Sequence, residues 1–125
     1  MTNLLNKTNE LPVVWPELLD KKIDNNQVEL HLFVSDKLHY FKGHFPESPI
    51  LAGVVQLHWV VEYAKSAFNL SDDKVANLEV LKFQVVIVPN QHLILTLTQK
   101  PNNKVVFTYT SERGQHASGR VVFGS

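Results

Sequence analysis

Residues Tyr40–Phe68 read YFKGHFPESPILAGVVQLHWVVEYAKSAF, and this stretch decides the fold. It joins a loop, in which His44 stands between a glycine and a Phe-Pro step, to one long and almost wholly apolar helical segment. That segment carries two titratable residues one helical turn apart, His58 and Glu62. An ionisable side chain buried without a partner costs free energy, so a purely structural helix has little reason to hold these two groups. We therefore interpret the stretch as a wall of an active site.

The helix is expected to begin between Ser48 and Gly53, where serine and proline are start signals, and to end near Phe68. Its apolar residues cover most of the circumference, so other parts of the protein must enclose it. Three polar side chains interrupt the apolar run: Gln56, His58 and Glu62. The run is therefore predicted to be a buried core helix and not a membrane span.

Strand patterns lie on both sides of this helix. Gln27–Val34 alternates, which predicts a strand with one buried face formed by Val28, Leu30, Leu32 and Val34. Pro12–Leu19 is expected to be a short helical or irregular segment that holds Trp15 against the core. After the helix, Val75–Val88 alternates with a phase slip at Val80–Leu81, which predicts a β-bulge or a bend.

The rest of the chain alternates in three further strands, centred on residues 93–97, 105–109 and 117–123. Turns are expected between them at Pro101-Asn102-Asn103 and at Glu112-Arg113-Gly114. One enclosed helix followed by a meander of antiparallel strands is an α+β pattern. We predict a single domain over residues 1–125, with residues 1–10 loose and one sheet curled around the helix.

Composition narrows the functional classes. The chain has 125 residues, 44% of them apolar and 19% charged, and its formal net charge is zero. A nucleic-acid-binding protein more often has a basic surplus, so no nucleic-acid partner is expected. The sequence contains no cysteine, which removes disulfide and thiol chemistry and fits a reducing compartment. The N-terminus lacks a basic head followed by an apolar stretch, so we expect no signal peptide and a cytoplasmic protein.

The central stretch resembles a known family. Phe41–Pro46 (FKGHFP), followed by Pro49 and by Gly53-Val54, is similar to the signature of the 3-hydroxyacyl-[acyl-carrier-protein] dehydratases of the FabA/FabZ type. Lys82-Phe83 followed by Val88-Pro89 is also similar to the family pattern. The resemblance covers about residues 27–123 and implies the hotdog fold, a curved antiparallel sheet wrapped around a central helix.

The same resemblance implies an activity and partners. The expected reaction removes water from a 3-hydroxyacyl thioester on acyl carrier protein and gives the trans-2-enoyl thioester, without a cofactor or a metal. Two subunits, identical or related, are expected to pair edge to edge. The acyl chain would lie in a tunnel lined by the helix and by four further side chains: Phe41, Phe45, Phe83 and Val85.

Residue roles follow from the matched motif. His44 matches the family histidine that takes a proton from the carbon next to the thioester carbonyl. Gly53 matches the glycine whose backbone N–H holds the thioester oxygen. That role is physically reasonable, because the first amides of a helix are unpaired and the helix dipole favours developing negative charge there.

The sequence also departs from the family. The catalytic carboxylate is expected fourteen positions after His44, and that position is His58; the family glutamine four residues later is Glu62. Glu47 and Ala52 replace a glycine and a proline of the motif. The run Val-Val-Gln-Leu-His-Trp is similar to the ApeI-like subgroup of aryl-polyene biosynthesis.

The replaced acid can still support the chemistry. A histidine with an ordinary pKa of about 6.5 titrates near neutrality, so His58 can protonate the leaving hydroxyl. Glu62, one turn further on the same face, can orient it. Two structural alternatives stay open: His58 and Glu62 as a satisfied buried pair, and a zinc site with His44, although no further ligand has a telling spacing.

Other residues receive less specific interpretations. Trp59 and Phe68 are expected to be core or dimer contacts. The remaining histidines are expected to be exposed in strands or loops: His31, His39, His92 and His116. Four basic residues either face an acidic carrier protein or are scattered solubilising charge: Lys37, Lys42, Arg113 and Arg120.

Two rival functions remain at this point. One is a hotdog acyl thioesterase, in which Glu47 or Glu62 would activate water. The other is a non-catalytic acyl-binding or partner subunit, because two catalytic-region positions have changed. Free thiol release, or carrier binding without turnover, would distinguish them from a dehydratase.

Overall fold

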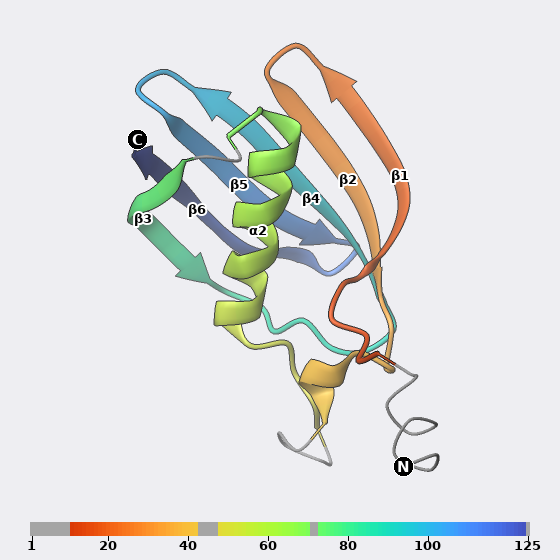
Figure 1. Cartoon of the computed structure of the whole chain (residues 1–125). Helices are drawn as coiled ribbons and strands as arrows, with labels where there is room; N and C mark the ends of the chain where they lie inside the picture. The colour runs from red at the N-terminus through yellow and green to blue at the C-terminus, as the bar shows by residue number, and fades with distance from the viewer. Residues whose placement is uncertain (1–10, 43–47, 71–72, 125) are drawn as a thin grey trace, which may run out of the picture.

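The computed structural model describes residues 11–42, 48–70 and 73–124. Six strands form one antiparallel sheet, and one long helix lies across one face of it (Figure 1). In chain order the elements are β1 (Glu17–Asp24), β2 (Gln27–Val34), the short 3-10 helix η1 (His39–Phe41), α2 (Gly53–Ala67), β3 (Lys74–Phe83), β4 (Gln91–Lys100), β5 (Lys104–Ser111) and β6 (Gly114–Gly124). The predicted α+β architecture of one curved sheet around one helix is confirmed, and the helix lies within its predicted limits.

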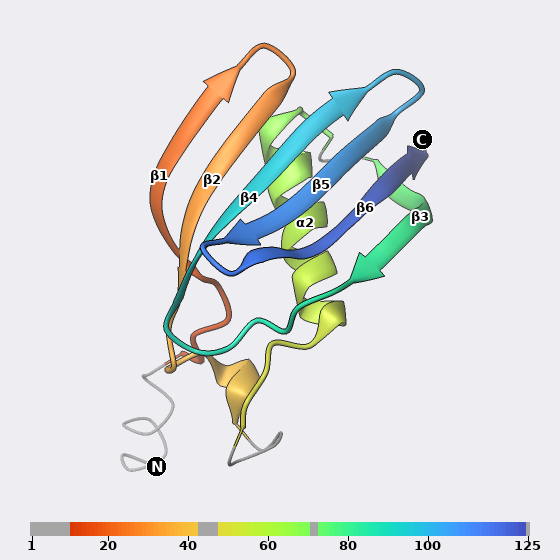
Figure 2. The same cartoon turned by 180° about the vertical axis from the view of Figure 1, so that it is seen from behind.

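The strand order corrects the predicted meander. The order across the sheet is β1-β2-β4-β5-β6-β3, and every neighbouring pair is antiparallel. β3 therefore does not lie beside β4, as a meander requires; it pairs with β6 at the far edge. The chain leaves β2, passes through α2 to that edge, and then returns to the middle of the sheet (Figures 1 and 2).

The core lies between α2 and the four middle strands. The alternating side chains predicted to face inward are buried in β2, β4, β5 and β6. From α2, the buried stripe is formed by Val55, Gln56, Trp59, Val60 and Ala64. Seen from behind, the other face of the sheet carries no helix in the described part of the chain (Figure 2). The sheet therefore has one core face and one open face, as the period-two pattern predicted.

The segment before β2 differs from its prediction. Pro12–Leu19 was expected to be helical or irregular, but Glu17 already begins β1, which is exposed along its whole length. Trp15 does pack against the helix: its ring centroid lies 6.5 Å from that of Trp59 and 5.4 Å from that of Tyr63. The Nε1–H of Trp59 donates to the carbonyl of Val14 at 3.0 Å, which fixes this segment across the helix.

The predicted bulge in β3 is present. Glu79 pairs with Arg120 and Lys82 with Ser118, so two residues, Val80 and Leu81, stand opposite Gly119. Val80 has a φ of 47°, a left-handed conformation that is unusual for a β-branched residue. A Cβ on Gly119 would lie 2.5 Å from Leu81 Cδ2, so the leucine occupies the space above the glycine.

This bulge sets the phase of the end of β3. After it, Phe83 pairs with Ala117, which is fully buried, and its ring lies against Gly53. The phase slip seen in the sequence thus turns Phe83 toward the start of α2.

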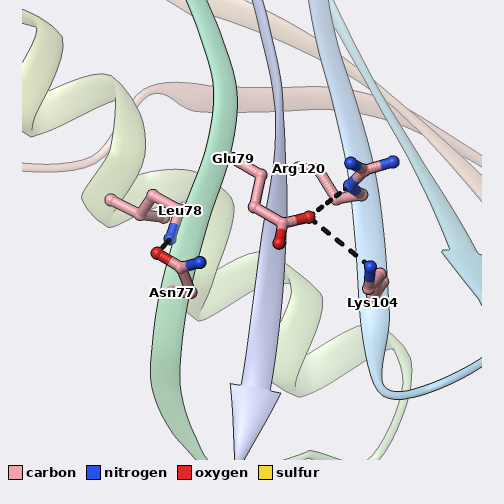
Figure 3. Close-up of polar contacts among 5 residues, drawn as sticks. All are labelled: Asn77, Leu78, Glu79, Lys104 and Arg120. Carbon is pink, nitrogen blue, oxygen red and sulfur yellow. Dashed lines mark hydrogen bonds and ion pairs between the residues drawn. The ribbon is translucent and has the colours of Figure 1, made fainter.

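An ion-pair cluster ties the same edge strand to its neighbours. Glu79 Oε1 accepts a hydrogen bond from Arg120 Nε at 2.7 Å and lies 3.5 Å from Lys104 Nζ (Figure 3). The Arg120 hydrogen bond, helped by the charge of Lys104, holds the pKa of the Glu79 carboxyl below its usual value. β3, β5 and β6 are therefore linked by side chains as well as by the backbone.

Candidate active site

A hollow of about 230 Å³ opens at the start of α2. Its walls come from the first turn of the helix and from the segment after β3, and they include Leu51, Gly53, Gln56, Phe83, Val85 and Val86. The N–H of Leu51 donates to the carbonyl of Ile87 at 2.8 Å and joins the two walls. Three residues predicted to belong to the site, Gly53, Phe83 and Val85, are thus brought together.

Gly53 is the first residue of α2, and the N-cap residue Ala52 makes no side-chain hydrogen bond to this end of the helix. The first amides of a helix lack intrahelical acceptors and carry the positive end of its dipole. A Cβ on Gly53 would lie 3.0 Å from both Cε1 and Cζ of Phe83, so a larger residue would require this ring to shift. The half-exposed ring of Phe83 and the amide of Gly53 therefore face the same small volume.

His116 holds the opposite wall in place, and the prediction that it is exposed is wrong. It is only 1% exposed. Its carbonyl accepts hydrogen bonds from the amides of Gln84 (2.8 Å) and Val85 (3.2 Å). Its Nδ1 lies 3.1 Å from the carbonyl oxygen of Val85 and 3.2 Å from that of Val86. Because carbonyls only accept, Nδ1 carries the proton, and Nε2 accepts from the Ser111 hydroxyl at 2.6 Å.

The sequence offered one signal for a further site residue and none for His116. Gln56 is a polar residue inside the buried stripe of α2, one turn before Val60. A polar side chain at such a position is expected to form hydrogen bonds. The alternation of β6 placed His116 on the open face of the sheet. What buries it is the segment 84–86, whose course the pattern did not predict.

His58 lies on a different face of the helix. It is exposed in the single chain, and its ring centroid is 5.5 Å from that of Trp15. Five residues along a helix correspond to a rotation of about 140°, so His58 points away from the direction of Gly53. Within one chain the structure does not bring His58 into the hollow beside Gly53.

Glu62 does not form the expected pair with His58. Its side chain is 43% exposed, and its Oε2 lies 3.9 Å from Lys65 Nζ. Among the residues that the structure describes, His58 and Glu62 therefore do not form a buried pair, and Glu62 does not orient His58. Both residues instead belong to a largely open helix face.

A second hollow, of about 510 Å³, adjoins the same helix face one turn before His58. Its walls are mainly apolar and include Tyr40, Ile50 and Val54, with His39 and Lys42 among the lining residues. Val54 is 73% exposed although it is strongly apolar. This apolar surface, next to His58, is left uncovered by the chain's own sheet.

The remaining predicted residues are distributed as follows. Phe41 is buried in the hydrophobic core and lines neither hollow. His44, Phe45 and Glu47 lie outside the described residues. Of the basic residues, Lys42 lines the second hollow, whereas Arg120 is engaged with Glu79.

Within residues 11–42, 48–70 and 73–124, no three His, Asp or Glu side chains are grouped so that they could hold a metal ion. Over the same residues, no helix has the length and apolarity needed to cross a bilayer.

Comparison with known proteins gives consistent matches. The model of the ApeI-like family, described as ApeI dehydratase, matches residues 20–120. The 3-hydroxyacyl-[acyl-carrier-protein] dehydratase FabZ of Chlamydia abortus is 31% identical over 130 residues, covering 94% of this chain and 79% of that protein. The protein of the same name from Streptococcus suis is 26% identical over 106 residues, covering 77% of this chain and 75% of that protein.

Solved structures give the same fold. A chain of the dehydratase heterocomplex ApeI:P from Xenorhabdus doucetiae superimposes with a TM-score of 0.82 at 24% identity, covering 89% of this chain and 99% of that one. An uncharacterized protein from Erwinia carotovora subsp. atroseptica superimposes with a TM-score of 0.77 at 32% identity, covering 88% and 96%. The hotdog fold expected from the motif is therefore confirmed.

Proposed function

Because this chain belongs to the ApeI-like dehydratase family, we propose that it removes water from a 3-hydroxyacyl thioester carried on acyl carrier protein. The product is the trans-2-enoyl thioester, formed in fatty-acid or aryl-polyene biosynthesis. The reaction takes place in the cytoplasm, in keeping with a cysteine-free chain. The FabZ relatives from Chlamydia and Streptococcus support this substrate class by their names.

The observation that carries the proposal is the hollow at the start of α2, where the N-cap residue Ala52 makes no side-chain hydrogen bond. A thioester oxygen placed at the Gly53 amide receives a backbone hydrogen bond and the positive end of the helix dipole. Both contacts strengthen as negative charge develops on that oxygen when the neighbouring carbon loses its proton. His44, which lies outside the described residues, is the proposed base.

We assign the proton donor to His58 of a second subunit. His58 and Val54 lie on one open helix face, so another protomer can cover them. The edge strand β3 and the segment after it also expose large apolar side chains, among them Val80, Phe83 and Val86. An unpaired apolar edge favours pairing with another strand. The solved ApeI:P heterocomplex supports an identical or a related hotdog partner.

We also propose which residues bind the acyl chain and which face the carrier protein. Phe83 and Val85 line the hollow at Gly53 and are assigned to the acyl chain, and Phe41 and Phe45 keep the same proposed role. Lys42 and His39, which line the second hollow, present positive or protonatable groups to an acidic carrier protein.

The test is turnover by the purified protein with 3-hydroxyacyl thioesters on acyl carrier protein. The expected product is the enoyl thioester without release of free thiol, and His44→Ala should abolish it with the fold intact. His58→Glu should retain measurable activity, whereas His58→Leu should lose most of it. Free thiol release would instead identify a thioesterase, and carrier binding without any turnover would identify a non-catalytic subunit.

A further inference from the structure

Gln56 is the most deeply buried polar side chain in the wall of the hollow at Gly53. It is 4% exposed and lies on the stripe of α2 that faces the sheet. Its side-chain Nε2 donates to the backbone carbonyl of Leu51 at 3.1 Å. Its backbone carbonyl accepts from the hydroxyl of Tyr109 at 2.6 Å. Because a carbonyl cannot donate, the amide must turn its nitrogen, and not its oxygen, toward Leu51.

This orientation leaves the side-chain oxygen of Gln56 without a donor among the described residues. The nearby Tyr109 cannot donate to this oxygen, because its single hydroxyl hydrogen is already donated to the backbone carbonyl of Gln56. Complete burial raises the pKa of Tyr109 well above its ordinary value, so the hydroxyl stays protonated and neutral. A buried acceptor without a partner costs free energy, and such an exception in a native structure needs an explanation.

The explanation we propose is that Gln56 Oε1 accepts a hydrogen bond from the 3-hydroxyl group of the substrate. This inference rests on the proposed function. Gln56 lies three residues after Gly53, and side chains at this spacing are neighbours, about 5–6 Å apart on the helix surface. With the thioester oxygen at the Gly53 amide, the hydroxyl two carbons further along the acyl chain lies within this span.

The contact has a consequence for specificity. The hydroxyl is the donor on the reacting part of the acyl chain, and the enoyl product has lost it. A buried polar group built to bind a hydroxyl discriminates against ligands without one, because it is then left unpaired. Gln56 therefore favours substrate over product and over a saturated acyl chain. Entry of the chain requires the half-exposed Phe83 ring to turn away from Gly53.

The experiment compares two ligands of equal chain length, the 3-hydroxyacyl and the saturated acyl pantetheine thioesters. Binding is measured calorimetrically in a His44→Ala background, which prevents turnover. We expect the 3-hydroxyacyl ligand to bind about tenfold more tightly, as one buried hydrogen bond allows. In Gln56→Met, which has a side chain of similar length but no such acceptor, the ratio should fall close to one.

Two further variants control the result. Gln56→Glu, with its carboxyl protonated, can donate to the Leu51 carbonyl and keep an acceptor oxygen, so it should retain most of the preference at low pH. Gln27→Met, at the exposed start of β2, should leave the preference unchanged. Full preference in a folded Gln56→Met protein would overturn the inference. Equal binding of the two ligands by the His44→Ala parent would overturn it as well, and that result needs no Gln56 variant to fold. Dehydration by the wild-type protein, measured separately, shows whether the proposed function itself stands.

Discussion

The hydroxyl oxygen of Ser111 lies 2.6 Å from Nε2 of His116. The carbonyls of Val85 and Val86 fix the tautomer of this buried imidazole at Nδ1, so the Ser111 hydroxyl is the donor to Nε2. The hydroxyl oxygen also accepts the amide hydrogen of Arg113 at 3.0 Å. The turn between β5 and β6 is thereby connected to the wall of the hollow beside Gly53.

Ser111→Ala is expected to lower the free energy of unfolding by about 1–2 kcal/mol, because it leaves the buried Nε2 of His116 without a donor. Denaturant unfolding followed by circular dichroism measures this change. Ser66→Ala, an exposed substitution on α2, is the matched control and should change the same quantity by less than about 0.5 kcal/mol. Equal stability of the two variants would mean that the Ser111 hydroxyl is replaceable by water.

Gly119→Ala tests the packing opposite the β3 bulge. The new Cβ would lie 2.5 Å from Leu81 Cδ2 and 2.8 Å from Phe107 Cε2, so the variant should lose about 1–3 kcal/mol of stability. The double variant Gly119→Ala/Leu81→Ala removes one side of the overlap. Its loss should therefore be smaller than the sum of the two single losses, and strict additivity would show that Leu81 does not occupy this space.

The Glu79 cluster predicts a pH dependence of stability. The pKa of this carboxyl is lower in the folded protein than its ordinary value of 4.5. The unfolded chain therefore takes up the proton first as the pH falls. The stabilisation is fully present above the unfolded pKa and is lost as the pH falls through the folded pKa. Thermal unfolding of the wild type and of Glu79→Gln should differ most near pH 7 and converge in acid. A constant difference between pH 7 and pH 3 would contradict this prediction.

The shared active site is tested by complementation. His44→Ala and His58→Leu chains, each inactive alone, are unfolded together and refolded as a mixture. If each site takes His44 from one protomer and His58 from its partner, every mixed dimer has one intact site. Random pairing makes about half of the dimers mixed, so roughly a quarter of wild-type activity should return. If both residues act within one chain, every site keeps a lesion and activity stays at background.

Much of the fold could be predicted where burial and sequence pattern coincide. Gln27–Val34 forms β2 within its predicted limits, because each inward side chain is buried and each outward one is not. The limits of α2 were also predicted correctly, because a stripe of its apolar side chains is buried against the sheet. β1 was missed because Glu17–Asp24 is an exposed edge strand, defined by pairing with β2 and not by an apolar face.

Two of the errors arise from contacts between residues far apart in the sequence, and the third from a competing local charge. β3 lies at the far edge of the sheet because of the long connection from β2 through α2. The alternation of apolar and polar residues within β3 does not reveal which strand it pairs with. His116 was expected to be exposed, because its burial depends on a segment about thirty residues away in the sequence. Glu62 was assigned to His58 by helical spacing, yet Lys65 offers an opposite charge one turn away.

The pairing of β3 with β6 has a consequence for how the protein is made. β6 follows every other strand in the sequence, so the partner of β3 is synthesised last. Until then a nascent chain presents an unpaired β3, with Val80 and Phe83 exposed, and a helix whose buried stripe is not yet covered by the complete sheet. Pairing between strands so distant in sequence is slow, and exposed apolar edges invite association during that delay. Ribosome-bound chains that stop before β6 should therefore recruit chaperones. Chains long enough for β6 to emerge from the ribosome should no longer recruit them.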